Sequence, residues 1–298
     1  MIKLFRFAGF IAWKIPAPLL DRIGVFLGLL LFYLIPIRKK LVLFQLGMVF
    51  PEKSASEIRK LARQNYIHYG KLLVEFLLLI DLKPGDSSKI DKTIRCENLP
   101  ALKDALKSGG KGAIITGGHV GLWEAIGPYL SRHGLHVTVA VKRVTSPLFQ
   151  SLREIFQAHP GVSILDPSLG NRRAAYLLKA LRDNRITGIF LDQYRHGEPF
   201  VPFLGHDART NSTAAILYRK TRVPLFLIHV IRKRVGDYSI ELHEMKIEIP
   251  EGVSDEDEIK AISGTINNGI SEVIRRNPDQ WLWAHRRFKE NPLFRSVN

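Results

Sequence analysis

The sequence predicts an α/β fold, a mixed sheet flanked by helices, with a hydrophobic helix at the N-terminus. Two observations lead to this prediction. After residue 88, short apolar runs of strand length alternate with segments of helical periodicity, which is the pattern of a sheet covered by helices. The chain has 298 residues, of which 46% are hydrophobic, so it can bury a sizeable core.

The elements follow in order along the chain. A helix is expected over residues 54–82, because Ser54 is a candidate N-cap with Glu57 three residues later, and Lys83-Pro84-Gly85 ends the pattern. Short apolar runs predict strands over residues 113–116, 136–142, 162–165, 187–191, 224–231 and 238–249. Helical periodicity predicts helices over residues 122–133, 147–158, 172–183, 212–220 and 255–276. The last of these helices begins with acidic residues, which suit the positive end of the helix dipole.

The N-terminal segment predicts a membrane anchor. Residues 23–37 read IGVFLGLLLFYLIPI without a charge, and Arg38-Lys39-Lys40 follows. This run is shorter than the ~20 residues needed to span a bilayer. The apolar, aromatic residues before it carry scattered Lys and Arg, as an interfacial helix does. We therefore expect an anchor over residues 1–45 and an α/β domain over residues 46–298. A signal peptide and a buried core helix are the alternatives.

Composition narrows the classes of partner and chemistry. Lys and Arg total 44 against 28 Asp and Glu, and the net charge of +16 favours an anionic partner such as a membrane surface, an acidic protein or a nucleic acid. Cys96 is the only cysteine, so an internal disulfide is excluded. The sequence lacks the G-x-S-x-G elbow and the phosphate-binding loop of P-loop enzymes, which argues against those two classes. The spacing of His133 and His136 lacks further clustered ligands, so no metal site is expected.

The stretch AIITGGHVGLWEA, residues 113–125, places His119 and Glu124 where a strand turns into a helix. On one continuous helix, side chains five positions apart would diverge by about 140°. The two side chains can therefore meet only if His119 precedes the helix, on a turn that Gly117 and Gly118 allow. A neutral histidine oriented by a carboxylate is a general base that can deprotonate a hydroxyl. A structural histidine that caps the helix is the alternative.

Three blocks resemble one enzyme family when taken together. They are GGHVGLWE at residues 117–124, GIFLDQYRHGEPFVPFLGHDARTNSTAAILYRKTRVPLF at 188–226, and DQWLWAHRRFK at 279–289. They resemble the late (lauroyl/myristoyl-type) lipid A biosynthesis acyltransferases, which belong to the glycerolipid acyltransferase superfamily marked by His-x4-Asp/Glu. The motif alone is weakly specific, but the resemblance runs in order from the N-terminal anchor to the tail and so covers most of the chain.

The resemblance implies a glycerolipid-acyltransferase-like sheet and an O-acyl transfer at the membrane. The donor would be acyl carrier protein or acyl-CoA, and the acceptor a hydroxyl of a lipid A precursor, a glucosamine-based lipid. His119 would be the general base and Glu124 would orient it, with no cofactor and no metal. The enzyme would lie at the cell inner membrane with its active site on the cytoplasmic side, and nucleic acid would not be a partner.

Further candidate residues come from the second block and from the resemblance. Asp192 and Gln193 end an apolar strand, where functional groups project in open α/β sheets, and the resemblance places them at the active site. Arg195 and Arg209 are candidates for binding a phosphate, and Thr210 for shaping the pocket. The family's arginine cluster after the second strand is reduced here to Arg153, so Lys142 and Arg143 are alternative cations for the transition state.

Some alternatives remain open from the sequence. Leu122 stands where the family commonly has Asn, which keeps another acceptor possible, such as a lysophospholipid or a mannosylated or other glycolipid. A non-catalytic basic membrane or nucleic-acid binding protein is the rival from a different class. The aromatic and basic tail, which includes Arg286 and Arg287, predicts an interfacial patch. Reversing these two charges should then weaken membrane or donor binding with little loss of fold.

Overall fold

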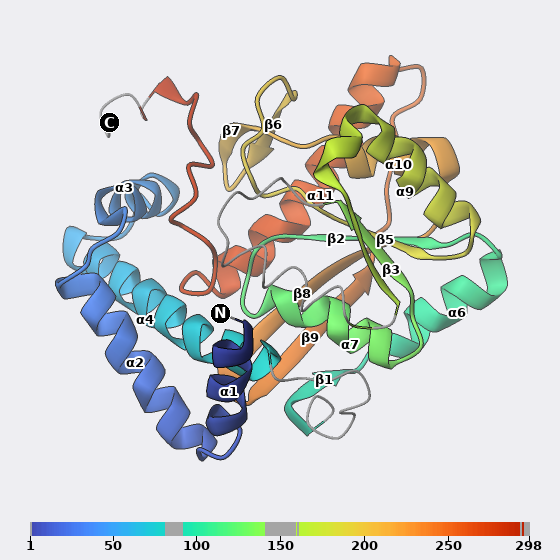
Figure 1. Ribbon diagram of the computed structural model, residues 1–298. Coiled ribbons are helices and arrows are strands. Elements are labelled where there is room, and N and C mark those ends of the chain that lie inside the picture. The colour runs from blue at the N-terminus through green and yellow to red at the C-terminus, as the bar shows by residue number, and fades with distance from the viewer. Residues whose placement is uncertain (1, 81–91, 141–158, 160, 293, 295–298) are drawn as a thin grey trace.

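The computed structural model describes residues 2–80, 92–140, 159, 161–292 and 294. Seven strands of this part of the chain form one mixed sheet in the order β1-β9-β8-β2-β5-β3-β4, with helices on both of its faces (Figure 1). The α/β class predicted from the sequence is therefore confirmed. The strands of the sheet are β1 (Ile94–Cys96), β2 (Ala113–Gly117), β3 (Val137–Ala140), β4 (Val162–Leu165), β5 (Ile186–Phe190), β8 (Leu225–Arg234) and β9 (Asp237–Glu244).

The helices and a separate hairpin complete the described elements. The helices are α1 (Ile2–Ala12), α2 (Ala17–Tyr33), α3 (Lys39–Val49), α4 (Ala55–Ile80), α6 (Leu99–Gly109), α7 (Ile126–Arg132), α9 (Arg173–Arg182), α10 (Thr213–Thr221) and α11 (Asp255–Arg276), with 3-10 turns η1 (Trp123–Ala125) and η2 (Pro167–Arg172). Strands β6 (Phe200–Phe203) and β7 (His206–Arg209) pair antiparallel to each other.

Strand β2 lies at the centre of the sheet. It pairs in parallel with β5 on one side and with β8 on the other, and β3 and β4 continue the parallel part beyond β5. On the other side, β9 runs antiparallel to β8, and β1 pairs with β9 in parallel. The carboxyl ends of β2 and β5 therefore lie next to each other in the middle of the sheet, where open α/β sheets place their functional groups.

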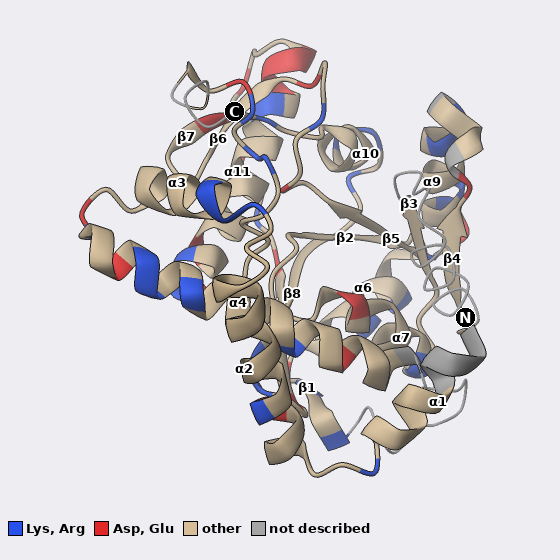
Figure 2. Ribbon diagram, turned by 60° about the vertical axis from the view of Figure 1, so that its left-hand side comes forward, with Lys and Arg blue, Asp and Glu red and all other residues tan. Residues whose placement is uncertain are grey.

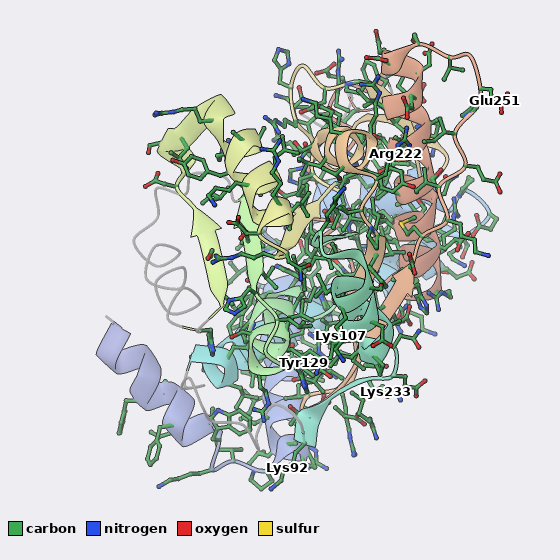
Figure 3. All side chains as sticks on the ribbon, turned by 90° about the vertical axis from the view of Figure 1, so that its right-hand side faces the viewer. Lys92, Lys107, Tyr129, Arg222, Lys233 and Glu251 are labelled. Carbon is green, nitrogen blue, oxygen red and sulfur yellow. The ribbon has the colours of Figure 1, made fainter. Side chains whose placement is uncertain are left out.

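The sheet has a hydrophobic core on each face, because successive side chains of a strand point to opposite sides. On β2, Ile114 packs with α9, α10 and α11, whereas its neighbour Ile115 packs with α6 and α7. On β8, Leu227 packs in the same core as Ile114, and Phe226 packs in the same core as Ile115. Figure 3 shows the side chains that fill these layers. Burial on both faces explains why β2 and most of β8 are continuously apolar in sequence.

Most predicted elements occur within a few residues of their expected bounds. Strand β4 and helix α11 have the expected bounds. Helix α4 begins after Ser54, whose N–H donates to the Glu57 carboxylate and whose hydroxyl oxygen accepts from the Glu57 N–H, as expected of a capping box. The helix expected over residues 122–133 begins as the 3-10 turn η1 and continues as α7. The helix expected over residues 147–158 lies outside the described residues. Strand β1, helix α6 and the β6–β7 hairpin were not predicted.

The N-terminal helices pack on the α/β core through one face only. Helix α2 buries Leu20, Gly24, Gly28 and Phe32 against α4, where a Cβ on Gly28 would lie 2.3 Å from the Ile67 backbone. The opposite face of α2 is exposed and apolar, and exposed large apolar residues also occur on α1 and in the turn after α2. They are Phe7, Phe10 and Ile11 on α1, Leu19, Ile23, Phe26 and Tyr33 on α2, and Leu34, Ile35 and Ile37 in the turn.

The expected anchor, residues 1–45, ends inside α3. Leu41 and Val42 of that helix belong to the same core cluster as Ile114 of the central strand. Most of the length of α1 and α2 carries no charge (Figure 2). None of the helices in the described part of the chain is both long enough and apolar enough to cross a bilayer.

The C-terminal tail is buried, which corrects the prediction of an interfacial aromatic and basic patch. Trp281, Trp283 and Arg287 are fully buried, and Phe288 is 1% exposed. The Arg287 guanidinium donates to the backbone oxygens of Gln193 and Arg209. Charge reversal at Arg287 would therefore place an unpaired carboxylate in the core and cost stability, contrary to the expected small loss of fold. Arg286 is exposed.

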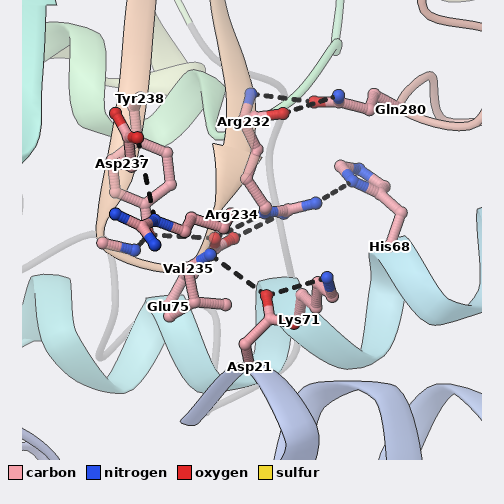
Figure 4. Close-up of polar contacts among 11 residues, drawn as sticks. Asp21, His68, Lys71, Glu75, Arg232, Arg234, Val235, Asp237, Tyr238 and Gln280 are labelled. Carbon is pink, nitrogen blue, oxygen red and sulfur yellow. Dashed lines mark hydrogen bonds and ion pairs between the residues drawn. The ribbon is translucent and has the colours of Figure 1, made fainter. Parts of the chain in front are cut away.

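A buried ion pair joins α4 to β8 (Figure 4). Glu75 binds the Arg232 guanidinium through both carboxylate oxygens, each at 2.5 Å, and the two side chains are 0% and 4% exposed. Arg232 also donates to Nδ1 of His68, and the Tyr238 hydroxyl donates to Glu75. The Gln280 side chain bonds to both the N–H and the carbonyl of Arg232, which ties the tail to this cluster.

Candidate active site

The site lies at the carboxyl ends of the two central strands. His119 follows β2 and Asp192 follows β5, and the last paired residues of these strands are Gly117 and Phe190. Because the two strands are parallel neighbours, residues that are 73 apart in the sequence meet here. The Asp192 carboxylate is 1% exposed, whereas the His119 side chain is 20% exposed. The aspartate is thus enclosed and the imidazole reaches the surface.

The loop that carries His119 is fixed through its backbone. The N–H of Gly118 donates to Nε2 of His229 at 3.1 Å, and the N–H of His119 donates to Asp192 at 2.8 Å. The next three N–H groups, of residues 120–122, donate to the carbonyls of Gly118, Gln280 and Val230. All N–H groups of residues 118–122 are therefore used inside the protein.

Three glycines permit this loop. Gly117 and Gly118 do not have a positive φ; they are needed because other groups come close. A Cβ would lie 2.3 Å from the Ile228 carbonyl oxygen at Gly117, and 2.9 Å from Ile270 at Gly118. The positive φ of 64° belongs to Gly121, where a Cβ would also lie 1.7 Å from the Val230 oxygen. Only glycine fits such positions.

The hydrogen bonds of the His119 ring define its tautomer. Nδ1 lies 2.7 Å from Oδ1 of Asp192, and since an ionised carboxylate only accepts, Nδ1 carries the proton. Nε2 lies 3.3 Å from the amide nitrogen of Gln193. Because this nitrogen only donates, Nε2 is unprotonated and accepts with its lone pair. Trp123 and Phe190 contact the ring edge to face, each at 5.2 Å between centroids. This arrangement can accept a proton at Nε2.

Glu124 lies close to His119 without being its hydrogen-bond partner. Its carboxylate accepts from the indole N–H of Trp123 at 3.1 Å, and it acts on His119 through its charge. Glu124 is in the 3-10 turn η1, and His119 precedes that turn, as the spacing of the motif required. The carboxylate that orients the ring in this structure is therefore Asp192.

Burial and charge act against each other in this group of residues. Burial alone would lower the pKa of His119, but the charge and the hydrogen bond of Asp192, together with Glu124, raise it above its usual value. Burial would raise the pKa of Asp192, but His119 and the donors on its oxygens hold it well below the usual range. Burial raises the pKa of Glu124, and His119 opposes this. The His119–Asp192 pair thus favours an ionised aspartate beside a basic imidazole.

Three residues of the site were not identified from the sequence. His229, on β8, accepts from Gly118, and burial lowers its pKa to about 3. His285 accepts from the N–H of Tyr194, and burial lowers its pKa to about 4. Trp281 donates from its indole N–H to Oδ2 of Asp192 at 2.8 Å. Trp281 and His285 belong to the third sequence block, and His229 lies outside all three blocks. All three are far from His119 in the sequence, so their contacts with the site could not be predicted from it.

The other predicted binding residues lie around the tail and the β6–β7 hairpin. Arg195 pairs with Glu198, and Arg209 pairs with Glu290 and stacks on the Phe200 ring. Thr210 is fully buried and accepts from Arg287 and from Asn267. Lys142, Arg143 and Arg153 lie outside the described residues. Leu122, which replaces the common Asn, is 2% exposed and packs into the core under α6 and α7.

The part of the chain that the structure describes contains no group of three or more His, Cys, Asp or Glu side chains arranged to hold a metal ion.

The fold and this site define an α/β enzyme in which a histidine, oriented by a carboxylate, lies at the centre of a mixed sheet. The family model of bacterial lipid A biosynthesis acyltransferases matches residues 2–290. The chain belongs to this family and is an acyltransferase.

Curated proteins of the same kind are similar over nearly the whole chain. A lipid A biosynthesis palmitoleoyltransferase of Escherichia coli K12 and a lipid A biosynthesis acyltransferase of Shigella flexneri are each 26% identical over 284 residues, which cover 94% of this chain and 88% of either relative. A lipid A biosynthesis lauroyltransferase of Escherichia coli K12 is 22% identical over 282 residues, with the same coverage of both chains.

Proposed function

We propose that the protein transfers a fatty acyl chain from an acyl thioester, carried by acyl carrier protein or coenzyme A, to a hydroxyl of a lipid A precursor. The observation that carries the proposal is the His119 ring, which is partly exposed, with Nδ1 bound to Asp192 and with Nε2 accepting from the Gln193 amide. Family membership and the names of the three relatives support the acceptor and the transfer reaction.

The proposed step begins when the acceptor hydroxyl replaces the Gln193 amide at Nε2 of His119. The hydroxyl proton passes to Nε2 as the oxygen attacks the thioester carbonyl carbon. The tetrahedral intermediate collapses by breaking the carbon–sulfur bond, and the leaving thiolate takes the proton from the imidazolium. Asp192 stabilises the imidazolium while it exists, as its charge already raises the pKa of His119. Glu124 adds a second negative charge nearby.

The developing oxyanion needs donors or a positive charge. The N–H groups of residues 118–122 all donate inside the protein, so this part of the loop has none to offer. This supports the proposal that a cationic side chain serves instead, and Lys142, Arg143 and Arg153 remain the candidates. We further propose that Gln193, Arg195, Arg209 and Thr210 line the substrate site.

We propose that the enzyme works at the cytoplasmic face of the inner membrane, attached through α1 and α2. The support is the exposed apolar face of these helices, followed by Arg38-Lys39-Lys40, in a protein of net charge +16. An apolar face beside basic residues suits an anionic bilayer surface.

The double variant Phe26→Ser with Leu34→Ser should show reduced flotation with anionic vesicles. Tyr176→Ser is the control, because Tyr176 is exposed but lies far from this face in sequence, and it should float like wild type. Equal flotation of both variants would contradict the attachment.

The test of the reaction is transfer from labelled acyl carrier protein to an under-acylated glucosamine disaccharide lipid. Wild type is compared with His119→Ala and with His136→Ala, an exposed histidine control. Transfer by wild type and His136→Ala alone would support both the reaction and the base. Transfer by all three would remove His119 as the base.

If wild type fails to acylate this lipid, either the acceptor or the donor is wrong. A panel of lysophospholipids and mannosylated or other glycolipids, with acyl-CoA as a second donor, then tests the alternative acceptors that Leu122 leaves open. Inactivity towards the whole panel would contradict the proposed acyl transfer.

A further inference from the structure

The two oxygens of the Asp192 carboxylate have different partners. Among the residues that the structure describes, Oδ1 accepts only the Nδ1 proton of His119, at 2.7 Å. Oδ2 accepts two N–H groups, from the His119 backbone and from the Trp281 indole, each at 2.8 Å. The indole comes from a segment 89 residues further along the chain and is fully buried. The orientation of the carboxylate thus depends on a residue outside the strands that carry the site.

The backbone around Trp281 is bonded to the loop after β2, which carries His119. Gly121 donates to the Gln280 carbonyl at 2.9 Å, and Val120 pairs with Trp281 in an antiparallel bridge. The Gln280 side chain holds both backbone groups of Arg232 on β8, and Asn65 on α4 donates to the Trp281 carbonyl. The backbone that carries the indole is therefore held by the loop after β2, by β8 and by α4, and the indole itself is fully buried beside Asp192.

We propose that Trp281 is a positioning residue, whose indole N–H fixes the plane of the Asp192 carboxylate so that the His119 ring keeps Nε2 towards the substrate. This rests on the proposed function of His119 as the base. A carboxylate with donors on one oxygen has one preferred orientation, and a group held this way does not need to reorganise during the reaction. Donation by the indole also draws charge from Asp192 and so limits how strongly it holds the Nδ1 proton.

Trp283 provides a matched control two residues away. It is fully buried as well, and its indole N–H makes one hydrogen bond, to the Pro278 carbonyl at 2.6 Å. Its ring contacts Trp281 and Phe50. Replacing either Trp by Phe therefore removes a similar volume and one indole bond, but only the change at position 281 touches Asp192. A purely structural role predicts the same result for both.

The experiment measures transfer kinetics against pH for wild type, Trp281→Phe and Trp283→Phe, with the folded fraction of each determined by near-UV circular dichroism. For Trp281→Phe we expect kcat to fall by about 10- to 100-fold with KM nearly unchanged, because a bond to a charged group that positions the base is lost. The acid limb of the kcat/KM profile should move to higher pH, since Asp192 then holds the Nδ1 proton more strongly. Trp283→Phe should stay within about twofold of wild type per folded molecule.

Equal losses in both variants, or a lower rate in Trp281→Phe with an unmoved acid limb, would overturn the proposal. If Trp281→Phe does not fold, β-(3-benzothienyl)alanine inserted at position 281 keeps the bicyclic ring and removes only the N–H. Wild-type kinetics with this analogue would equally overturn it. Failure of the proposed function is recognised separately, since wild type itself would then transfer no acyl group.

Discussion

The molecule contains two buried pairs in which a carboxylate binds a basic side chain, Glu75 with Arg232 and Asp192 with His119. The Glu75–Arg232 pair is enclosed, with 0% and 4% exposure, and both carboxylate oxygens bind the guanidinium. The Asp192–His119 pair is enclosed only at the aspartate, and the imidazole is 20% exposed with Gln193 at 3.3 Å from Nε2. In the first pair the two charged groups bind each other through both carboxylate oxygens, whereas in the second Nε2 of the imidazole is bound only to the Gln193 amide among the described residues.

We propose that this difference separates a structural ion pair from a catalytic one. A fully satisfied buried pair contributes to holding elements together, and breaking it leaves an uncompensated charge. A pair with one open basic atom can exchange a proton with a bound hydroxyl. Burial and charge alone do not distinguish the two, since both contain deeply buried carboxylates. The two pairs are distinguished by the unprotonated Nε2 of His119, which can accept a proton.

The largest effect is expected from Asp192→Asn. The two donors on Oδ2 would hold the amide oxygen there, so the amide N–H groups would face Nδ1 of His119 and force the proton onto Nε2. With the wrong tautomer, kcat should fall by about 10³- to 10⁴-fold. The measurement is acyl transfer per folded molecule.

Glu124→Gln is the control for that change. It also removes a negative charge near His119, but it leaves the ring's hydrogen bond and tautomer intact. A loss of about tenfold is expected, roughly one pKa unit of stabilisation of the imidazolium. A greater loss in Glu124→Gln than in Asp192→Asn would reverse the roles assigned to the two carboxylates.

Glu75→Gln should change stability rather than catalysis. It leaves the buried Arg232 guanidinium without its counter-charge, and the free energy of unfolding should fall by about 3–5 kcal/mol. Urea unfolding measures the loss, and activity per folded molecule should stay close to wild type. The double variant Glu75→Leu with Arg232→Met should recover much of the stability, because no unpaired charge remains. A loss of activity as large as that of Asp192→Asn would break the distinction between the two pairs.

A smaller effect is expected from His229, which supports the site as a neutral acceptor. Its pKa in the folded protein is about 3, below the usual 6.5, so its contribution to stability is complete above pH 6.5. That contribution is lost as the pH falls from 6.5 towards 3, at up to about 1.4 kcal/mol per pH unit. His229→Gln retains an acceptor for Gly118, so the loss of stability between pH 7 and pH 5 should become smaller by about 1–2 kcal/mol. A His229→Gln variant that keeps the wild-type pH dependence in urea unfolding would contradict this role.

Two aromatic and apolar segments that look alike in sequence take opposite places in the fold. The N-terminal segment leaves a row of large apolar residues exposed on α1 and α2, including Phe26 at 65%. The C-terminal segment was expected at the membrane interface, but its two Trp residues are fully buried, and so is Arg287. The two segments have similar compositions, so composition does not predict which of them is buried. Burial depends on the elements packed against each segment, and these are not evident from the sequence.

What the sequence determined by itself was local. Apolar periodicity gave the α/β class and most elements, the Ser54–Glu57 pair marked the start of α4, and the five-residue spacing required His119 to precede its helix. These features depend on neighbours in the chain, so their patterns are legible in a linear sequence.

The tertiary structure decided which carboxylate holds His119. Glu124 is five residues away and Asp192 is 73 residues away, yet Asp192 makes the hydrogen bond. The reason is the strand order: β2 and β5 are parallel neighbours, so their carboxyl ends bring His119 and Asp192 together, and the buried Trp281 indole completes the carboxylate's donors. Strand order and burial arise from the packing of the whole chain, and no spacing within one motif specifies them.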